Sequence, residues 1–253
     1  MAVSLREFCA ECNSLLRPER FSDYCPNGLQ VEGRSRIGKI VSGVTACGEL
    51  IERAAAAEAD ALLVHHGYFW KGESPVIKGY RKQRIAALLK YDLSLVAFHL
   101  PLDVHEEFGN NVQLARRLEL RIEGDIHRHD GFPLVLRGRL AEPLGLEAFE
   151  ERLAETLGQA PLAIRGGDHA IETIAWCTGA AQGYIEQAAV AGVDAYLSGE
   201  ISEQTVHAAR ESGLHYLAAG HHATEQYGVQ ALGAHLAELF GIGHEFIDVP
   251  NPA

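Results

Sequence analysis

The strongest constraint on the fold is an alternation of apolar, strand-like runs with helical segments, which occurs twice along the chain. Strands are expected at residues 39–44, 61–64 and 93–98, and again at 171–177, 195–198 and 215–219. Helices are expected at residues 49–58, 78–90 and 111–118, and again at 146–157, 182–191 and 203–211. A first helix at 3–16, a strand at 133–140, a long helix at 223–240 and a strand at 245–249 complete the set. This alternation predicts the α/β fold class.

The two series resemble copies of one unit. At an offset of 134 residues, segments 60–63 and 194–197 both read Asp-Ala-x-Leu, and at an offset of 122 residues His99 and Asp103 pair with His221 and Glu225. We therefore predict an internal duplication with two similar, interlinked α/β halves. The first half is expected at residues 1–125 plus about 220–253, and the second, inserted half at residues 126–219.

Bulk properties narrow the functional classes. The 253 residues are 47% hydrophobic and 22% charged, which suits a globular protein with a sizeable core. A net charge of -12 argues against sequence-independent nucleic-acid binding, although a local basic channel stays open as an alternative. Because neither a membrane span nor a secretory signal is visible, no membrane partner is expected and the location defaults to the cytoplasm. Five scattered cysteines are expected to be free thiols.

Side chains of metal-ligand type follow three of the expected strands. His65 and His66 come after residues 61–64, Asp103 closes a segment that begins after residues 93–98, and His221 and Glu225 follow residues 215–219. Imidazole and carboxylate hold borderline divalent cations such as zinc, iron or manganese. The sequence therefore predicts two divalent metal ions in a dinuclear site between the two halves.

Each of these residues also has an ordinary structural interpretation. A histidine after an apolar run is often a hydrogen-bonded core residue, and Glu225 can stabilise a helix start. It is their joint occurrence in related segments that favours ligation. His99 has two equally good interpretations: it binds the metal itself, or it orients another residue that does. Pro101 is expected to hold the segment after His99 extended or turned rather than helical.

Five ligands for two metal ions leave open coordination positions, and two neighbouring ions can share a water molecule. Both features suit a site that catalyses hydrolysis. Downstream of the histidine pair, Tyr68 and Trp70 can stack on a base and Lys71 can meet a phosphate, unless this segment is simply a loop whose aromatic side chains pack on the core.

The sequence around His127 and His129 is polar and typical of a loop, so these two histidines are expected at the surface.

Four motifs in order carry a family resemblance: Asn27-Gly-Leu-Gln-Val-Glu-Gly33, Val64-His-His-Gly67, His99-Leu-Pro-Leu-Asp103 and Gly220-His-His-Ala-Thr-Glu225. Over essentially the whole chain, the sequence resembles the type-two GTP cyclohydrolase-I homologue family, a dinuclear-metal group related to NGG-interacting factor. The family usually has proline after the histidine pair, where this chain has Gly67.

The resemblance implies a toroidal homohexamer and a metal-dependent hydrolase that acts on cyclic amidine or amide C–N bonds of a purine nucleotide or related heterocycle. It implies five metal ligands, which are His65, His66, Asp103, His221 and Glu225. In that chemistry a metal-bridging hydroxide attacks the purine ring while His222 or Glu106 shuttles the proton. The competing interpretations are a metal-stabilised, ring-shaped binding or regulatory protein without turnover, and a protein of metal storage or delivery.

Overall fold

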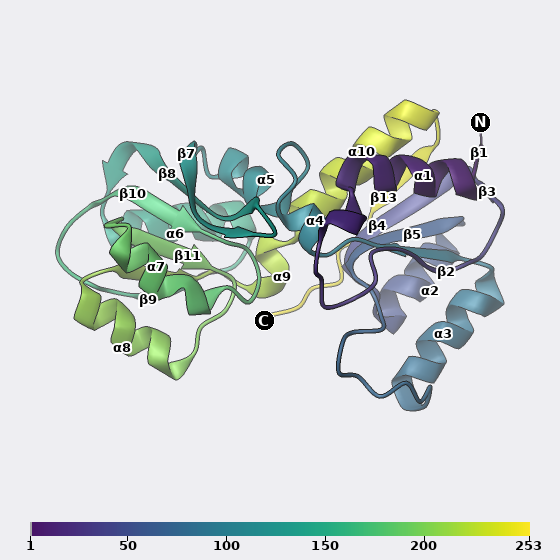
Figure 1. The fold of residues 1–253 in the computed structure, drawn as a ribbon, viewed down its shortest axis with the longest axis horizontal. Helices are drawn as coiled ribbons and strands as arrows, with labels where there is room; N and C mark the ends of the chain where they lie inside the picture. Colours follow the sequence, from purple (N-terminus) through teal and green to yellow (C-terminus); the bar gives the residue numbers. More distant parts are fainter. Residues whose placement is uncertain (1) are drawn as a thin grey trace. The chain divides into compact units, whose positions relative to one another are not determined.

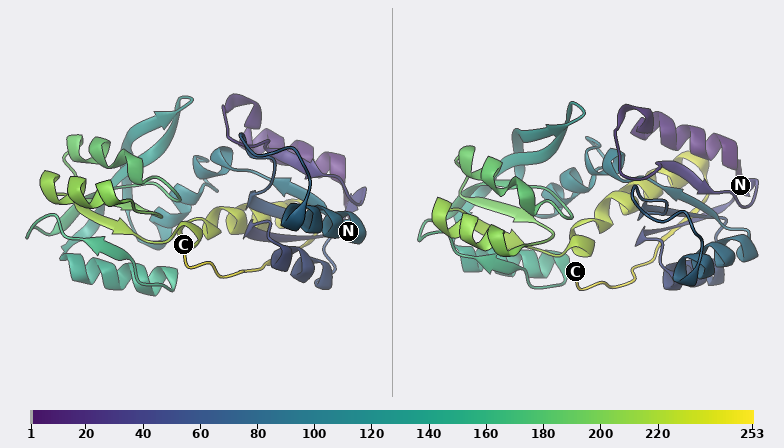
Figure 2. Two further views of the ribbon diagram at one scale, coloured as in Figure 1. Left: turned by 90° about the horizontal axis from the view of Figure 1, so that it is seen from below. Right: turned by 60° about the horizontal axis from the view of Figure 1, so that its bottom comes forward.

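The computed structural model describes residues 2–253, which divide into two compact units (Figures 1 and 2). The N-terminal unit comprises the residues up to Phe108 together with Gly228–Val249, and the inserted unit comprises Gly109–Tyr227 together with Pro250–Ala253. The N-terminal unit is therefore formed by two separate stretches of chain, and the expected boundaries at 125 and 220 fall inside the inserted unit. As a result, His221 and Glu225 belong to the inserted unit and not to the unit that carries His65.

The N-terminal unit is built on a five-stranded sheet in the order β13-β4-β5-β6-β2. Its strands are β2 (Gly28–Val31), β4 (Lys39–Thr45), β5 (Ala61–His66), β6 (Ser94–Ala97) and β13 (Gly243–Phe246). Neighbouring strands are parallel except for β2, which pairs antiparallel with β6. A separate two-stranded pairing joins β1 (Val3–Ser4) to β3 (Arg36–Ile37).

Helices cover both faces of this sheet because β4, β5 and β6 are apolar on both sides, as buried parallel strands are. On one face lie α1 (Leu5–Leu16), which precedes the 3-10 helix Pro18–Arg20, and the part of α10 (Gln226–Phe240) that belongs to this unit. On the other face lie α2 (Gly48–Ala56) and α3 (Gly79–Tyr91). The short helix α4 (Leu100–Asp103) follows β6.

The inserted unit is built on a six-stranded sheet in the order β7-β8-β10-β11-β12-β9. Its strands are β7 (Arg121–His129), β8 (Phe132–Leu144), β9 (Leu162–Ile164), β10 (Ile171–Trp176), β11 (Ala195–Ser198) and β12 (His215–Ala218). The helices α5 (Asn110–Arg117) and α6 (Leu146–Leu157) pack with the apolar side chains of one face. The remaining helices are the 3-10 helix Gln182–Tyr184, α7 (Ile185–Val190), α8 (Glu203–Ser212) and α9 (His221–Thr224).

Both units repeat the same central pattern, which supports the predicted duplication. In each, three parallel strands carry an antiparallel strand beside the third, namely β4-β5-β6-β2 and β10-β11-β12-β9. Asp60 Oδ2 accepts the backbone N–H groups of residues 38 and 39, at 2.7 and 3.0 Å, and so forms a carboxylate bracket at the strand start. Asp194 Oδ2 accepts those of residues 172 and 173, at 3.1 and 2.7 Å, so the bracket recurs at the predicted offset of 134.

The second offset, 122, is wrong by one residue. Ala61 lies opposite Ser94, and its counterpart Ala195 lies opposite His215. The third strands therefore correspond at an offset of 121, which aligns His99 with Gly220. The two motifs of histidine and acid share a spacing but do not occupy equivalent positions of the repeat.

Three local expectations also need correction. Pro101 does not prevent a helix, because it stands in the first turn of α4, where its missing N–H group has no intrahelical acceptor to lose. His127 and His129 lie on strand β7 and not in a loop, and both are half-buried. The helix expected at 223–240 is interrupted at Glu225, which separates α9 from α10.

Candidate metal centre

The N-terminal unit gathers three imidazoles at one edge of its sheet. His65 and His66 end β5, and His99 follows the neighbouring parallel strand β6 at the N-cap of α4. Carboxyl ends of parallel strands meet at the same edge, so these side chains converge although they come from different parts of the chain. One ring nitrogen of each lies within 4.8 Å of a ring nitrogen of the other two. These groups form the first donor set.

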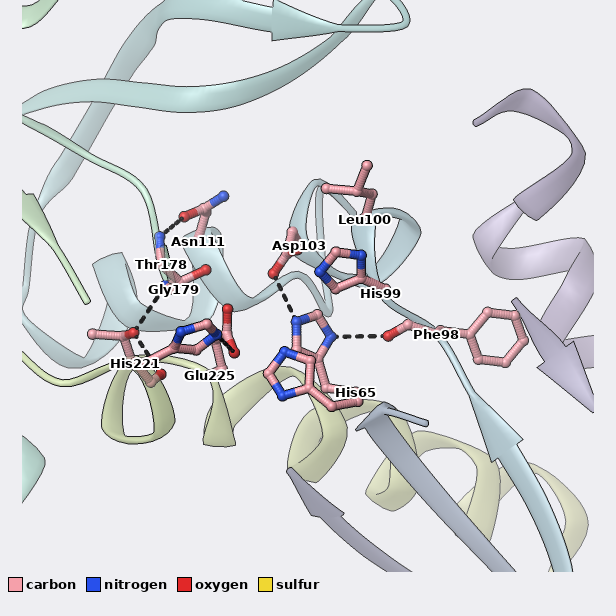
Figure 3. A network of polar contacts seen from close by, with 12 residues as sticks. His65, Phe98, His99, Leu100, Asp103, Asn111, Thr178, Gly179, His221 and Glu225 are labelled. Atoms are coloured by element: carbon pink, nitrogen blue, oxygen red, sulfur yellow. Dashed lines mark hydrogen bonds and ion pairs between the residues drawn. The ribbon is translucent and has the colours of Figure 1, made fainter. Parts of the chain in front are cut away.

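The Nδ1 atom of each of these histidines faces an oxygen of the protein. In His65 it is 2.9 Å from the carbonyl oxygen of Phe98, and in His99 it is 2.7 Å from Asp23 Oδ1 (Figure 3 shows the contact of His65). The Nδ1 atom of His66 lies 3.1 Å from Thr45 Oγ1. A carbonyl or carboxylate can only accept, so Nδ1 of His65 and His99 carries the proton and Nε2 is the atom with ligand character.

Asp103 completes the first donor set from the end of α4. Its Oδ1 lies 3.4 Å from His65 Nε2, the nitrogen opposite the one held by Phe98 (Figure 3). Both residues are buried, with His65 at 0% and Asp103 at 6% exposure. Burying a carboxylate next to an imidazole is costly unless the pair is neutralised or holds a cation, so this arrangement favours metal ligation.

Asp23, which sequence reasoning missed, holds His99 in place. Besides His99, its carboxylate accepts the N–H of Leu100 at 3.0 Å and the side-chain amide of Asn27 at 2.8 Å. Burial opposes ionisation of Asp23, but the hydrogen bonds from His99, Asn27 and the backbone of Tyr24 outweigh it and lower the pKa. Asp23 is therefore an ionised carboxylate that orients an imidazole beside the candidate ligands.

The inserted unit carries a second donor set at the start of α9. His221 Nε2 lies 3.0 Å from Glu225 Oε2, and His221 Nδ1 lies 2.7 Å from Glu200 Oε1. Burial opposes protonation of His221, but its hydrogen bonds and charge interactions with Glu225 and Glu200 raise the pKa to about 9. Metal binding through Nε2 requires loss of that proton, after which Glu200 still accepts a hydrogen bond from Nδ1.

The backbone around Glu225 is closely fitted to its carboxylate. A Cβ atom on Gly179 would lie 2.1 Å from Glu225 Oε1, and the φ of +66° at Gly179 is itself suited to glycine. The N–H of Gly179 donates to Thr224 Oγ1 at 3.1 Å, and the N–H of Thr178 donates to Asn111 Oδ1 at 2.9 Å (Figure 3). These bonds fix the loop after β10 against the buried Glu225, which is 3% exposed.

The other predicted site residues lie in different settings. Tyr68 is buried in the core, and its hydroxyl donates to the carbonyl of Ala46. Trp70 lies edge-on to His99, with ring centroids 5.0 Å apart, and 5.8 Å from His66. Lys71 is exposed on the following loop.

The two candidate proton carriers also differ in setting. Glu106 is exposed after α4. His222 is buried, and its backbone N–H donates to the carbonyl of Ala253. Within residues 2–253, neither belongs to a group of three residues whose ligand atoms converge.

Each donor set suits a divalent cation. Neutral imidazole nitrogens and ionised carboxylate oxygens are what zinc, iron and manganese accept. His65, Asp103 and Glu225 are buried, the other histidines of the two sets are partly buried, and the orienting partners are already in place. The residue Gly67, where a proline was expected from the resemblance, is closely packed: a Cβ there would lie 2.2 Å from Gln30 Oε1.

Comparison with known proteins identifies the family. The family model for Duf34/NIF3 (NGG1p interacting factor 3) matches residues 3–252. A relative from Pseudomonas aeruginosa, named GTP cyclohydrolase 1 type 2 homolog, is 55% identical over 253 residues and covers 100% of both chains. The chain belongs to the Duf34/NIF3 family, which confirms the resemblance seen in the sequence motifs.

Solved structures confirm the fold. The structure of protein ybgI, described as of unknown function, matches with a TM-score of 0.95 at 47% identity and covers 99% of this chain and 100% of its own. TTHA1606 from Thermus thermophilus matches with a TM-score of 0.90 at 34% identity, over 99% and 100% of the two chains. Among residues 2–253, no helix combines the length and apolar character that crossing a membrane requires.

Proposed function

We propose that this protein is a metal-dependent hydrolase that opens a C–N bond of a purine nucleotide or related heterocycle. We assign two divalent ions per chain to five ligands, namely His65, His66, Asp103, His221 and Glu225. The observation that carries the proposal is the orientation of the imidazoles: protein oxygens engage Nδ1 of His65 and His221, so that Nε2 faces a buried carboxylate in each case.

When bound, two such ions would activate a water molecule at neutral pH and polarise the bond that is attacked. The chain's own residues would bind and orient the substrate. The indole of Trp70 lies beside His66 and His99 and can contact a planar ring, and exposed Lys71 can meet an anionic substituent. We propose His222 or Glu106 as the group that moves the proton.

The name of the Pseudomonas aeruginosa relative supports a cyclohydrolase reaction and makes GTP the first substrate to test. We further propose that the chain acts in the cytoplasm as a homohexameric ring, a state that light scattering on the purified protein would show as six times the mass of the 27.5 kDa chain. A monomeric mass would contradict the ring.

The experiment is a turnover assay on protein stripped of metal and reloaded separately with zinc, iron or manganese. GTP and a series of cyclic amides are supplied, and formate release and loss of the heterocycle's absorbance are followed. We expect turnover only in loaded protein, abolished by His65→Ala and retained by the surface control His207→Ala on α8. If fully loaded protein leaves every substrate intact, the chain acts instead as a metal-stabilised binding or regulatory protein.

A further inference from the structure

A carboxylate that neither the sequence motifs nor the family resemblance assigns lies against the second donor set. Glu200 follows β11, and its Oε1 is 2.7 Å from Nδ1 of His221. On the other side of the ring, Nε2 of His221 is 3.0 Å from Glu225. The imidazole is thus held between two carboxylates, of which Glu225 is buried and Glu200 is partly exposed, with 40% of its side chain accessible.

The internal repeat shows which residue of the N-terminal unit corresponds to Glu200. Ile40 pairs with Ala61 in the N-terminal unit, and Ile174 pairs with Ala195 in the inserted unit, so β5 and β11 correspond at the offset of 134. At that offset Glu200 occupies the position of His66. Both copies therefore carry a side chain of metal-site chemistry at the equivalent position, which is the last residue of β5 in one unit and lies just after β11 in the other. In the inserted unit this side chain is an acceptor that contacts a histidine.

The backbone that carries Glu200 is fixed by close packing. The hydroxyl of Tyr216 donates to the carbonyl of Glu200, and the N–H of Gly220 donates to the carbonyl of Gly199 at 2.9 Å. A Cβ atom on Gly199 would lie 2.8 Å from Cα of His221, so only glycine allows this approach. The contact of Glu200 with His221 is therefore built into the loop and is not a chance encounter of two surface side chains.

We propose that Glu200 is a positioning residue for metal binding through His221. Its carboxylate accepts a hydrogen bond from Nδ1–H of His221 and so selects the tautomer in which Nε2 carries the lone pair. The same hydrogen bond makes Nε2 a stronger metal ligand. The contact also keeps the ring from turning Nδ1 towards Glu225. The inference rests on the proposed metal site, but it concerns affinity for metal and requires no turnover.

The test compares Glu200→Ala and Glu200→Gln with the matched control Glu203→Ala, which removes an exposed glutamate from the first turn of α8. Affinities for Zn²⁺ and Co²⁺ are measured by chelator competition, and the Co²⁺ absorption bands are recorded. Loss of the partner of a ligating histidine typically weakens metal binding by roughly 10–100-fold, and we expect this for Glu200→Ala together with altered Co²⁺ bands. Glu203→Ala should bind as the unmodified protein does.

Glu200→Gln separates positioning from general structural damage. Its amide oxygen still accepts from Nδ1 but without charge assistance, so affinity should recover to within about tenfold of the unmodified protein yet stay measurably below it. Unmodified affinity in both Glu200 variants overturns the inference and leaves the metal site intact. If Glu200→Ala does not fold, unmodified affinity in Glu200→Gln alone overturns it. Absence of metal binding by the unmodified protein overturns the proposed function as well.

Discussion

At the scale of single residues, the two donor sets share one device, which is an imidazole with its Nδ1 atom held by the protein. The acceptor is a backbone carbonyl for His65 and a carboxylate for His99 and His221. Because each ring is oriented before a cation arrives, little side-chain entropy remains to be lost on binding. The acceptors matter as much to the proposed site as the ligands do.

The close fit around Glu225 leads to a first prediction. In Gly179→Ala the new Cβ would overlap the carboxylate of Glu225 and force a left-handed backbone on a residue that disfavours it. We expect metal affinity to fall by at least tenfold and the free energy of unfolding to drop by about 1–3 kcal/mol. Chelator competition and chemical denaturation measure the two effects.

Gly183→Ala is the control for adding a methyl group without overlap or a left-handed backbone, because no neighbouring atom lies within 4 Å of the site of its Cβ and its φ is not positive. It should leave both quantities unchanged. Equal behaviour of the two variants would show that the contact between Gly179 and Glu225 is unimportant.

The candidate metal ligands could be predicted from the sequence, whereas the residues that orient them through hydrogen bonds could not. His65, His66 and His221 follow apolar runs, so strand ends and a recurring spacing point to them. Asp23 contacts a histidine 76 positions away, and no periodicity relates the two residues. For Tyr68 the sequence left a substrate contact and packing on the core as alternatives, and in the structure the ring is buried in the core.

At the scale of elements, the paired brackets of Asp60 and Asp194 define the start of equivalent strands in the two units. Burial raises the pKa of each carboxyl, but hydrogen bonds outweigh it: for Asp60 they come from Arg34 and the backbone of residues 38 and 39, and for Asp194 from Thr173 and the backbone of Glu172. Both pKa values are therefore lowered on folding.

The lowered pKa values give a second prediction, on acid stability. A carboxyl that is more acidic when folded contributes stability above its unfolded pKa of about 4, and this contribution is lost as the pH falls through the folded value. Asp60→Asn and Asp194→Asn should each lower the free energy of unfolding at pH 7 by about 1–3 kcal/mol. The variants should then lose less stability than the unmodified protein when the pH falls below about 4.

Urea denaturation at a series of pH values measures this, with the exposed Asp168→Asn as the control. If the free energy of unfolding of Asp60→Asn or Asp194→Asn falls with decreasing pH as steeply as that of the unmodified protein, the carboxylate bracket does not contribute to acid sensitivity as predicted.

Most elements could be predicted because apolar periodicity is strong in them. Residues 146–157 and 195–198 were predicted with the bounds that the structure shows. Strand β7 was missed because its side chains are mostly exposed and polar, which leaves little alternation to detect. The error at Pro101 came from treating proline as a helix breaker without regard to its position in the first turn.

At the scale of the whole molecule, the two units provide similar scaffolds that carry different side chains. Both units place candidate site residues at or just after the ends of the second and third parallel strands. The N-terminal unit carries His65, His66 and Asp103, and the inserted unit carries Glu200, His221 and Glu225. Neither set alone offers the five ligands that two ions were predicted to need. We therefore expect both sets to be required for full metal loading.

The central claim is most directly tested by the metal content of the purified, reconstituted protein. Elemental analysis should find two divalent ions per chain in the unmodified protein and in His207→Ala, and fewer than two in both His66→Ala and His221→Ala. Full loading in both ligand variants, or an unmodified protein that retains no divalent ion after reconstitution, would contradict the account.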